Sequence, residues 1–208
     1  MPDWAKAMSR SDATQAYLAY HRATIEHLKD EPLIESWQLE NEFWLRSFGI
    51  NFNYSRRRLK QEFAVLRELD PNRPIIMSTA QIISLPLRKP TPDIYATSVY
   101  RNIYNSKKHS YTTTWAAPKI YTIKRILIKA IKHRDLIIHE LQTEPWGPKA
   151  NWEMSIKEQD KSMNADEIYD AVSYAKATGI SHMDLWGAEW WYWRDDKSIN
   201  TTIQKLLK

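Results

Sequence analysis

The alternation of helical and extended segments along the chain constrains its fold more than any other feature. Apolar residues recur at helical spacing in residues 11–29, 55–69, 120–133, 165–178 and 199–207. Short runs typical of strands lie among these segments, at residues 33–42, 74–79, 93–100, 136–140 and 180–186. Strands that alternate with helices predict parallel βαβ units, and therefore an α/β fold.

The spacing of the strands distinguishes between two α/β architectures. Glu42 and Glu140, each at the end of a predicted strand, are 98 residues apart, with two further strands between them. This gives three units of about 33 residues, close to the roughly 30-residue repeat of a (β/α)8 TIM barrel. A doubly wound sheet usually carries a glycine-rich phosphate turn, but the chain has only four glycines and no such turn. The pattern therefore favours a barrel.

Only part of such a barrel is present in the sequence. Residues 1–208 contain no linker and no low-complexity tract, so we expect a single domain. Five of the eight strands can be identified, and the other three would have to precede Met1. Five strands leave two unpaired edges in a barrel. We therefore expect a partial barrel that needs an N-terminal complement to supply the missing strands.

Composition and charge exclude several kinds of site. The chain has no cysteine, which removes disulfides, zinc-thiolate sites and cysteine nucleophiles, and its six histidines show no metal-ligand spacing. We expect no metal and no other cofactor. The net charge of +5 is spread along the chain, and the cluster at residues 56–60 begins a helical pattern, so we expect no nucleic-acid partner. Neither a membrane segment nor a signal peptide is visible, and the sequence leaves the cellular location open.

The aromatic residues are mostly of the two polar kinds. Ten Trp and eleven Tyr stand against four Phe. Both side chains combine a flat apolar face with a hydrogen-bonding group. Sugar rings present C–H faces that stack on such side chains, so a saccharide site explains the bias. A Trp-rich core explains it equally well.

Two of the predicted strands carry carboxylates where a buried strand should be apolar. The first lies within IESWQLENEFW (Ile34 to Trp44) and the second begins LIIHELQTEPW (Leu136 to Trp146). Alternation places Gln38, Glu40 and Glu42 on one face of the first strand, and Ile138, Glu140, Gln142 and Glu144 on the matching face of the second. In a barrel this face points inward, and its carboxyl end forms the mouth where barrel enzymes keep their chemistry.

Two inward carboxylates at the ends of strands are typical of glycoside hydrolysis. One carboxylic acid protonates the leaving oxygen, while a second carboxylate attacks the anomeric carbon. The alternative is a pair of buried carboxylates that arginine side chains or backbone N–H groups bind for structural reasons.

Several motifs resemble those of one large group of enzymes, clan A of the retaining glycoside hydrolases. The segment Trp37-Gln-Leu-Glu-Asn-Glu42 resembles the motif on strand 4 of that clan, and Ile138-His-Glu-Leu141 resembles the motif on strand 7. The run from Asp184 to Trp193 is similar to the end of strand 8. The likeness is greatest to cellulase-like members of families 5 and 39.

The resemblance covers strands 4 to 8, which is most of the chain. The arginine and the sugar contacts that strands 1 to 3 contribute in the clan have no counterpart here. Pro2-Asp-Trp4 looks like the end of strand 3. We therefore interpret Met1 as an internal start or a truncation point.

The resemblance also implies a role for individual residues. Glu140 would be the nucleophile and Glu42 the acid/base, with carboxyl groups about 5 Å apart. Asn41 would bind the sugar 2-hydroxyl, and Trp186 would stack on the ring. Tyr100 would donate a hydrogen bond to Glu140 and so keep it ionised. The pKa of Glu42 would have to be raised, which the nearby negative Glu140 would achieve.

Other residues near the two motifs have less definite roles. Glu144, Trp146 and Trp190 are candidate substrate contacts, although a salt bridge explains Glu144 equally well. Glu40 has the inward parity but lies one layer deeper, so we interpret it as a support residue. His139 alternates outward and is expected to be packed.

We therefore predict a retaining glycoside hydrolase that cleaves a β-linked oligosaccharide or polysaccharide. The alternative is an inactive remnant of such a barrel that binds carbohydrate without cleaving it. The sugar, the linkage and the choice of exo or endo action depend on the segments at residues 43–53, 103–119 and 148–163, which the sequence does not define. The oligomeric state is also left open.

Overall fold

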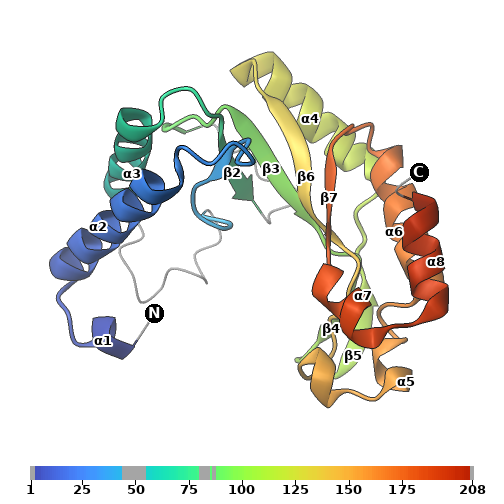
Figure 1. Ribbon diagram of the computed structural model, residues 1–208. Coiled ribbons are helices and arrows are strands. Elements are labelled where there is room, and N and C mark those ends of the chain that lie inside the picture. Colours follow the sequence, from blue (N-terminus) through green and yellow to red (C-terminus); the bar gives the residue numbers. More distant parts are fainter. Residues whose placement is uncertain (1–2, 44–54, 80–84, 86–87, 207–208) are drawn as a thin grey trace. The chain divides into compact units, whose positions relative to one another are not determined.

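The structure is a computed structural model that describes residues 3–43, 55–79, 85 and 88–206. The chain is a mixed α/β protein, as predicted, and forms two compact units. One lies within residues 1–96 and 132–135, and the other within residues 97–131 and 136–208. The larger sheet has the strand order β1-β2-β3-β6-β7, and the smaller sheet consists of β4 and β5 (Figure 1). This strand order is compatible with part of a barrel, whereas the single domain over residues 1–208 stays a prediction.

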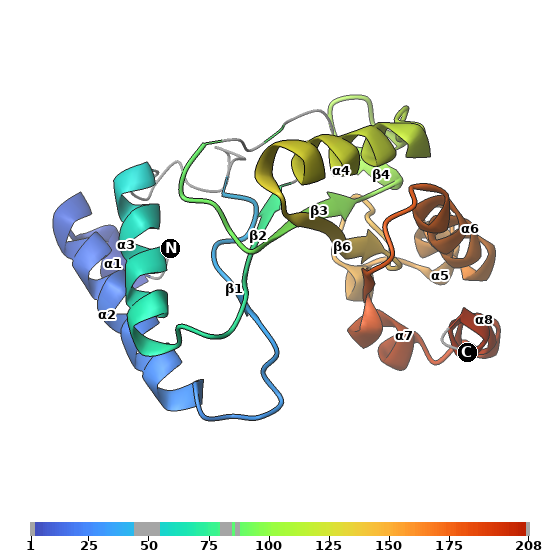
Figure 2. The ribbon, with the colours of Figure 1, turned by 90° about the horizontal axis from the view of Figure 1, so that it is seen from above.

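The first unit consists of a parallel strand pair and the helices that pack beside it. Its elements are α1 (Asp3–Lys6), α2 (Arg10–Leu28), β1 (Trp37–Gln38), α3 (Arg56–Leu69), β2 (Ile75–Thr79) and the start of β3 (Ile94–Val99). Strand β1 pairs with β2 in parallel. Helices α2 and α3 lie side by side (Figures 1 and 2).

Serine caps define the starts of the two long helices in this unit. The hydroxyl of Ser9 accepts a hydrogen bond from the backbone N–H of Asp12, and that of Ser55 accepts one from the N–H of Arg58. Each bond satisfies one of the free N–H groups in the first turn. The sequence predicts the Ser55 cap and the end of α3 at Asp70 correctly.

The apolar residues of this unit form one core. Its buried members come from α2, α3, β2 and the segment after β1: Ile25, Leu39, Phe43, Leu59, Phe63, Leu66, Ile75 and Met77. Leu39 is therefore on the helix-facing side, as its parity predicts. Trp37 packs against the same core, and its indole N–H donates to Asp70 at 2.9 Å.

The first acidic strand is much shorter than predicted. The sequence predicts a strand over residues 33–42, but β1 covers only Trp37–Gln38. Glu40 and Glu42 have positive φ values of 59° and 51°, in the left-handed region. Side chains alternate between faces only where the backbone is extended. Parity therefore does not determine where Glu40 and Glu42 point.

The predicted end of strand 3 is also wrong. Residues Asp3–Lys6 form the short helix α1, and Pro2 lies outside the described residues.

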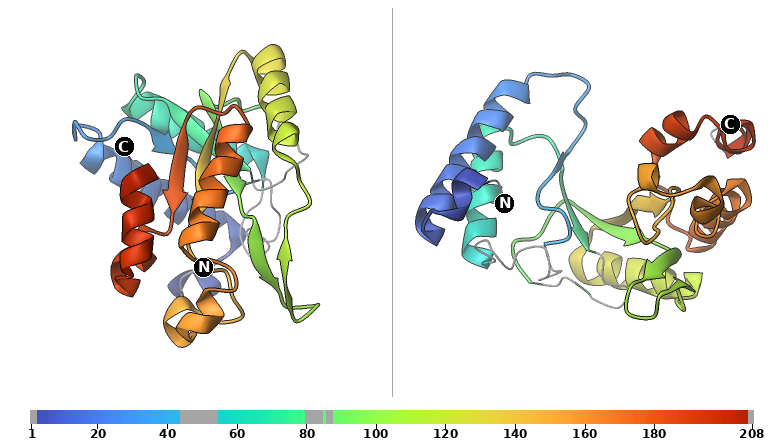
Figure 3. Two further views of the ribbon diagram at one scale, coloured as in Figure 1. Left: turned by 90° about the vertical axis from the view of Figure 1, so that its right-hand side faces the viewer. Right: turned by 90° about the horizontal axis from the view of Figure 1, so that it is seen from below.

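The second unit contains the other acidic strand. Its elements are β4 (Asn102–Asn105), β5 (Ser110–Thr113), α4 (Pro118–Lys132), β6 (Asp135–Gln142), a 3-10 turn (Asn151–Glu153), α5 (Ile156–Gln159), α6 (Ala165–Ala177), β7 (Met183–Trp186), α7 (Ala188–Arg194) and α8 (Lys197–Leu206). Strand β6 pairs with β7 in parallel. Figure 3 shows α6 (orange) beside α8 (red).

Several elements of this unit differ from the predicted ones. Residues 103–119 were expected to be a loop, but they include most of an antiparallel hairpin in which Tyr104 pairs with Tyr111. Residues 148–163 contain the 3-10 turn and α5. Strand β6 extends two residues beyond the predicted end at Glu140. The predicted glycine at the end of α6 is present, because Gly179 adopts a φ of 72° after the helix.

Candidate active site

Glu140 lies near the carboxyl end of β6 and is surrounded by hydrogen-bonding groups. The residue is 7% exposed. The hydroxyl of Tyr100 donates to its Oε2 at 3.0 Å, which is the contact that the resemblance implied. The Nε2 atom of His139 lies 3.4 Å from its Oε1. His139 on β6 and Tyr100, which follows β3, therefore both lie at the carboxylate of Glu140.

These contacts determine the charge of Glu140. Burial raises the pKa of its carboxyl, but hydrogen bonds from His139, Tyr100 and Ser98 and the charge of His139 outweigh this effect. The net result is a pKa below the ordinary value. Glu140 is therefore ionised at neutral pH, which is the state that a nucleophile requires.

Trp146 lies beside the same tyrosine. The ring centroids of Tyr100 and Trp146 are 4.7 Å apart, with the planes inclined by 50°. The backbone of Trp146 is fixed on both sides, because its N–H donates to Ser162 Oγ at 2.8 Å and its carbonyl accepts from the N–H of Tyr104 at 2.8 Å. The indole is nevertheless exposed. An open aromatic face therefore lies next to the residue that binds Glu140.

Glu144 and Trp186 form a second hydrogen-bonded pair just beyond β6 and at the end of β7. The indole N–H of Trp186 donates to Glu144 Oε1 at 2.9 Å, and the side chain of Asn151 donates to Oε2 at 3.3 Å. Burial and the nearby charge of Glu189 raise the pKa of Glu144, against the hydrogen bonds from Trp186 and Trp146. Trp186 remains 48% exposed, so its hydrogen bond fixes the ring without covering it.

Trp190 differs from the other candidate tryptophans because it belongs to the core. It is 2% exposed and packs with Met163 and Ile168. Its indole N–H donates to Gln159 Oε1 at 2.8 Å. A stacking platform needs an open face, so we interpret Trp190 as a support for its neighbours on α7 and not as a platform.

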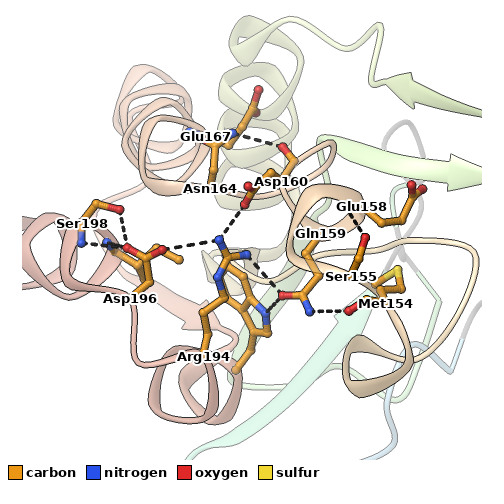
Figure 4. A network of polar contacts seen from close by, with 12 residues as sticks. Met154, Ser155, Glu158, Gln159, Asp160, Asn164, Glu167, Arg194, Asp196 and Ser198 are labelled. Carbon is orange, nitrogen blue, oxygen red and sulfur yellow. Dashed lines mark hydrogen bonds and ion pairs between the residues drawn. The ribbon is translucent and has the colours of Figure 1, made fainter.

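A network of charged and amide groups holds this part of the second unit (Figure 4). Arg194 donates to Gln159 at 3.3 Å and to Asp160 at 2.8 Å, and it also contacts Asp196 at 3.4 Å. Gln159 donates to the carbonyl of Met154 at 3.1 Å. These bonds connect α5 with α7 and its following turn, and so fix the helix that carries Trp190.

Gln142 is a buried amide that the sequence placed on the inward face but to which it gave no role. Its Oε1 accepts from the backbone N–H groups of Arg101 and Asn102 at 2.8 and 2.9 Å, and its Nε2 donates to the carbonyl of Asn102 at 2.8 Å. The amide thus attaches the segment after β3 to β6. It positions Tyr100, which immediately precedes that segment.

The candidate acid/base lies in the first unit. Glu42 is buried, and its backbone N–H donates to Ser78 Oγ at 2.8 Å. The hydroxyl of Ser78 donates in turn to Asn41 Oδ1 at 3.3 Å, and Gln38 Nε2 lies 3.5 Å from the same oxygen. Ser78, on β2, therefore holds both residues of the Asn-Glu pair. No signal in the sequence marked Ser78, because a serine within a strand is ordinary.

Glu40 takes part in a buried ion cluster, in agreement with its interpretation as a support residue. Arg58 donates to Glu40 and, at 2.5 Å, to Glu62 Oε1. Its guanidinium also lies over the rings of Tyr17 and Phe43, at 5.2 and 5.8 Å from their centroids. Burial raises the pKa of Glu62 to about 8, and the charge of Glu40 adds to this effect while that of Arg58 opposes it. One cation thus contacts two carboxyl groups, and Glu62 is mainly protonated at neutral pH.

The two halves of the predicted catalytic pair are each locally ordered. The first unit brings Asn41 and Glu42 together, and the second unit brings Glu140, Tyr100 and Trp146 together. The separation of about 5 Å between the two carboxyl groups that retention requires stays a prediction, as does the raised pKa of Glu42.

Two further properties of the described residues bear on the site. Within residues 3–43, 55–79, 85 and 88–206, no group of three or more His, Asp or Glu side chains could hold a metal ion. None of the helices in this part of the chain is both long and apolar enough to span a bilayer.

Solved structures with a similar fold are glycoside hydrolases. The catalytic domain of a GH53 protein from Ignisphaera aggregans has a TM-score of 0.56 at 15% identity over 91% of this chain and 57% of its own. A GH2 β-galacturonidase from Eisenbergiella tayi, bound to galacturonate, has a TM-score of 0.55 at 14% identity over 84% of this chain and 29% of its own. A β-D-glucuronidase from Dictyoglomus thermophilum has a TM-score of 0.55 at 12% identity over 84% and 28%.

No protein-family model and no curated protein matches the chain. The chain spans between a quarter and three fifths of the length of the three similar structures. At this level of identity the likeness concerns the fold. In its fold, the chain is therefore similar to part of several glycoside hydrolases that act on β-linked glycosides.

Proposed function

We propose that the chain supplies strands 4 to 8 of a (β/α)8 barrel, related to clan A of the retaining glycoside hydrolases, which cleaves β-linked carbohydrate by double displacement. The observation that carries this proposal is the environment of Glu140. A buried carboxylate near the end of a parallel strand accepts a hydrogen bond from Tyr100, has a lowered pKa, and lies in a region with exposed indole rings.

The proposed reaction assigns one step to each carboxylate. A carboxylate oxygen of Glu140 attacks the anomeric carbon, and the bond to the leaving oxygen breaks as Glu42 gives that oxygen its proton. Glu42 then removes a proton from water, which attacks the same carbon and releases Glu140. Asn41 would bind the sugar 2-hydroxyl, and this contact would be strongest in the transition state. Trp186 and Trp146 would offer open faces to the sugar.

The fold likeness and the two local arrangements support this assignment. The similar structures are named as glycosidases, and the chain corresponds to only part of each. We therefore propose that full activity needs an N-terminal complement that provides the remaining part of the barrel. Such a complement also explains why the strand order places β1 at an edge of the sheet.

A mechanism-based 2-fluoro glycoside with a good leaving group tests the proposed nucleophile. Mass spectrometry of a proteolytic digest should find the glycosyl group on Glu140. The variant Glu140→Gln should not be labelled and should lose about 10⁴-fold or more in any hydrolysis that the chain catalyses. Glu167→Gln is the matched control, because it changes a half-buried carboxyl of the same unit that has no assigned role at the site, and it should leave labelling of Glu140 intact. Labelling of any other carboxyl would overturn the assignment.

The second candidate is a carbohydrate-binding protein without catalysis. The exposed tryptophans of the second unit favour it, since binding requires nothing from the first unit. Binding of an oligosaccharide with no labelling of Glu140, both in the chain alone and with a complement peptide for the missing strands, would support this candidate over the enzyme.

A further inference from the structure

The second unit contains a pocket whose walls combine indole rings with carboxylates. Its volume is about 210 Å³, and its lining residues are Glu144, Asn151, Trp152, Glu189, Trp190 and Trp193. Pockets for drug-sized ligands are about 300–1,000 Å³, so this one suits a single ring-sized group. It lies past the carboxyl ends of β6 and β7, where Glu144 and Glu189 follow the strands by two and three residues.

The aromatic walls of the pocket are open to a ligand. Trp152 is 76% exposed and Trp193 is 56% exposed. Large exposed aromatic side chains that gather at a hollow mark a binding site more often than a chance arrangement. Their flat faces suit the C–H face of a sugar ring.

The polar groups of the pocket are fixed before any ligand arrives. Glu144 accepts hydrogen bonds from Trp186 and Asn151, at 2.9 and 3.3 Å. Glu189 and Trp193 are four residues apart on α7, and therefore lie on the same side of the helix. Trp190, between them in sequence, is held by its bond to Gln159. A ligand would therefore find a rigid acceptor in Glu144, while the fixed Trp190 holds the helix that carries Trp193.

The charge of the pocket is negative. Glu189 and Glu144 interact electrostatically, and Glu189 disfavours the ionised form of Glu144. A cation between them would relieve this repulsion, and indole faces attract cations as well. A second anion would add to the repulsion. The negative charge of the pocket therefore favours one sugar over another when the two have the same shape but carry different charges.

We propose that this pocket is a second sugar-binding subsite, and that its two carboxylates make it select a ring with a protonated amino group and reject a uronic acid. The similar structures include a β-galacturonidase bound to galacturonate and a β-D-glucuronidase. The pocket would give this chain a preference for amino sugars over uronic acids. The place of the subsite beside a catalytic centre rests on the proposed function, whereas its charge selectivity does not.

Three trimers with the same β-linked glucan backbone test the proposal: fully deacetylated chitotriose, cellotriose, and cellotriose oxidised to the uronic acid. Binding is measured by calorimetry on the Glu140→Gln variant, so that no sugar is consumed. The measurement is made at about pH 6 and low salt, so that most of the sugar amines carry a proton and the charge interactions are little screened. The amino trimer should bind at least about fivefold more tightly than cellotriose. The uronic acid should bind at least about fivefold more weakly than cellotriose.

Variants locate the binding and its charge preference. Trp193→Ala and Trp152→Ala should each weaken cellotriose binding about tenfold or more, because each removes a stacking face. Trp115→Ala is the matched control, since Trp115 is also exposed in the same unit but does not line the pocket. Glu189→Gln should retain cellotriose binding and abolish most of the preference for the amino trimer. All four positions are exposed, so the folded state should survive each change.

The outcomes separate this proposal from the proposed function. Cellotriose binding that persists in both tryptophan variants, or a uronic acid that binds as tightly as cellotriose, overturns the subsite and leaves the role of Glu140 intact. A preference for the amino trimer over cellotriose and the uronic acid, in a chain whose Glu140 is never labelled, supports the subsite and counts against the proposed glycosidase activity.

Discussion

Carboxylates are buried in both units, but their partners differ in kind. In the unit with α2 and α3, a cation holds them, because Arg58 donates to Glu40 and Glu62. In the unit with β6 and β7, His139 lies beside Glu140, but among the described residues no arginine bridges the carboxylates, and aromatic donors contribute as well, namely the hydroxyl of Tyr100 and the indole N–H of Trp186.

This difference distinguishes a structural cluster from a binding region. An arginine that bridges two buried carboxylates neutralises charge and completes the packing around it. A tyrosine or tryptophan donor orients a carboxylate but leaves its negative charge, and its ring remains available to a ligand. The partners of a carboxylate therefore indicate its role better than burial does, since Glu62 and Glu140 are both buried.

Replacement of the cation should have the largest effect on stability. Arg58→Met removes the partner of two carboxylates in the core, and breaking a buried ion pair in this way costs about 3–5 kcal/mol. Urea unfolding followed by circular dichroism measures this loss. Arg22→Met is the matched control: Arg22 pairs with Glu68 at the surface, at 2.8 Å, and should give a far smaller change. Equal losses in the two variants would show that the buried cluster has no special structural role.

A methyl group at Gly187 should have the next largest effect. The residue has a φ of 138°, and an added Cβ would lie 2.9 Å from the backbone of Thr143 and 2.8 Å from Glu144 Cβ. Gly187→Ala should therefore cost about 2–3 kcal/mol and displace Glu144 from Trp186. Gly179→Ala is the control, because its φ of 72° imposes strain but its Cβ would make only an ordinary contact, 3.8 Å from the Arg125 side chain. A loss of stability in Gly187→Ala no larger than the loss in Gly179→Ala would contradict the close approach of Gly187 to Thr143 and Glu144.

The hydroxyl of Tyr100 should matter less for stability, and its effect should depend on pH. A hydrogen bond to a charged group contributes about 1.5–3 kcal/mol, and Tyr100→Phe removes the one to Glu140. Because the bond lowers the pKa of Glu140 in the folded state, its contribution is present above the ordinary pKa of about 4.3 and is lost as the pH falls through the lower, folded value.

Unfolding free energies of wild type and Tyr100→Phe, measured from about pH 7 to about pH 3, should therefore converge at acid pH. The carboxyl 13C chemical shift of Glu140 should report a raised pKa in the variant. Tyr111→Phe removes a similar bond to Glu158 at the surface, and should change stability less. A pH-independent difference between wild type and Tyr100→Phe would count against the ionised Glu140.

The indole N–H of Trp186 should have the smallest effect. Trp186→Phe keeps an aromatic face but removes a donor to half-buried Glu144, for which we expect a loss of about 0.5–1 kcal/mol at neutral pH. The pKa of Glu144 is already raised, so stability falls as the pH rises above the ordinary value. Trp186→Phe should make stability fall more steeply as the pH rises. In proteins that also carry Glu144→Gln, Trp186→Phe should no longer change stability. Persistence of the effect in the double variant would mean that Trp186 acts through packing.

Local signals in the sequence predicted several elements correctly. Ser55 marks the start of α3 and Gly179 follows the end of α6, because capping depends on the few residues at a helix end. Strand parity placed Leu39 in the core. The motif resemblance correctly implied the bond between Tyr100 and Glu140, although 40 residues separate them.

Other features lay beyond local signals. The left-handed backbone at Glu40 and Glu42 ended β1 early, since period-two alternation holds only in an extended chain. The β4–β5 hairpin has no glycine in its turn, the usual signal for such a connection. Ser78 acquired its importance only when β2 brought it beside Asn41.

The sequence by itself determined the alternation of the long helices with strands, the Ser55 cap, the glycine after α6 and the two acidic segments, because these follow from neighbouring residues and from hydrophobic periodicity. It did not predict the short helices or the β4–β5 hairpin. It distinguished Glu40 from Glu140 only by position along the strand and by the motif resemblance, since each lies in a similar apolar and aromatic context. Tertiary structure brought one carboxylate beside an arginine from α3, and the other beside the tyrosine after β3 that the motif resemblance had implied. The physical reason is that the charge and accessibility of a carboxylate depend on groups within a few ångströms of it, and these groups come from distant parts of the chain.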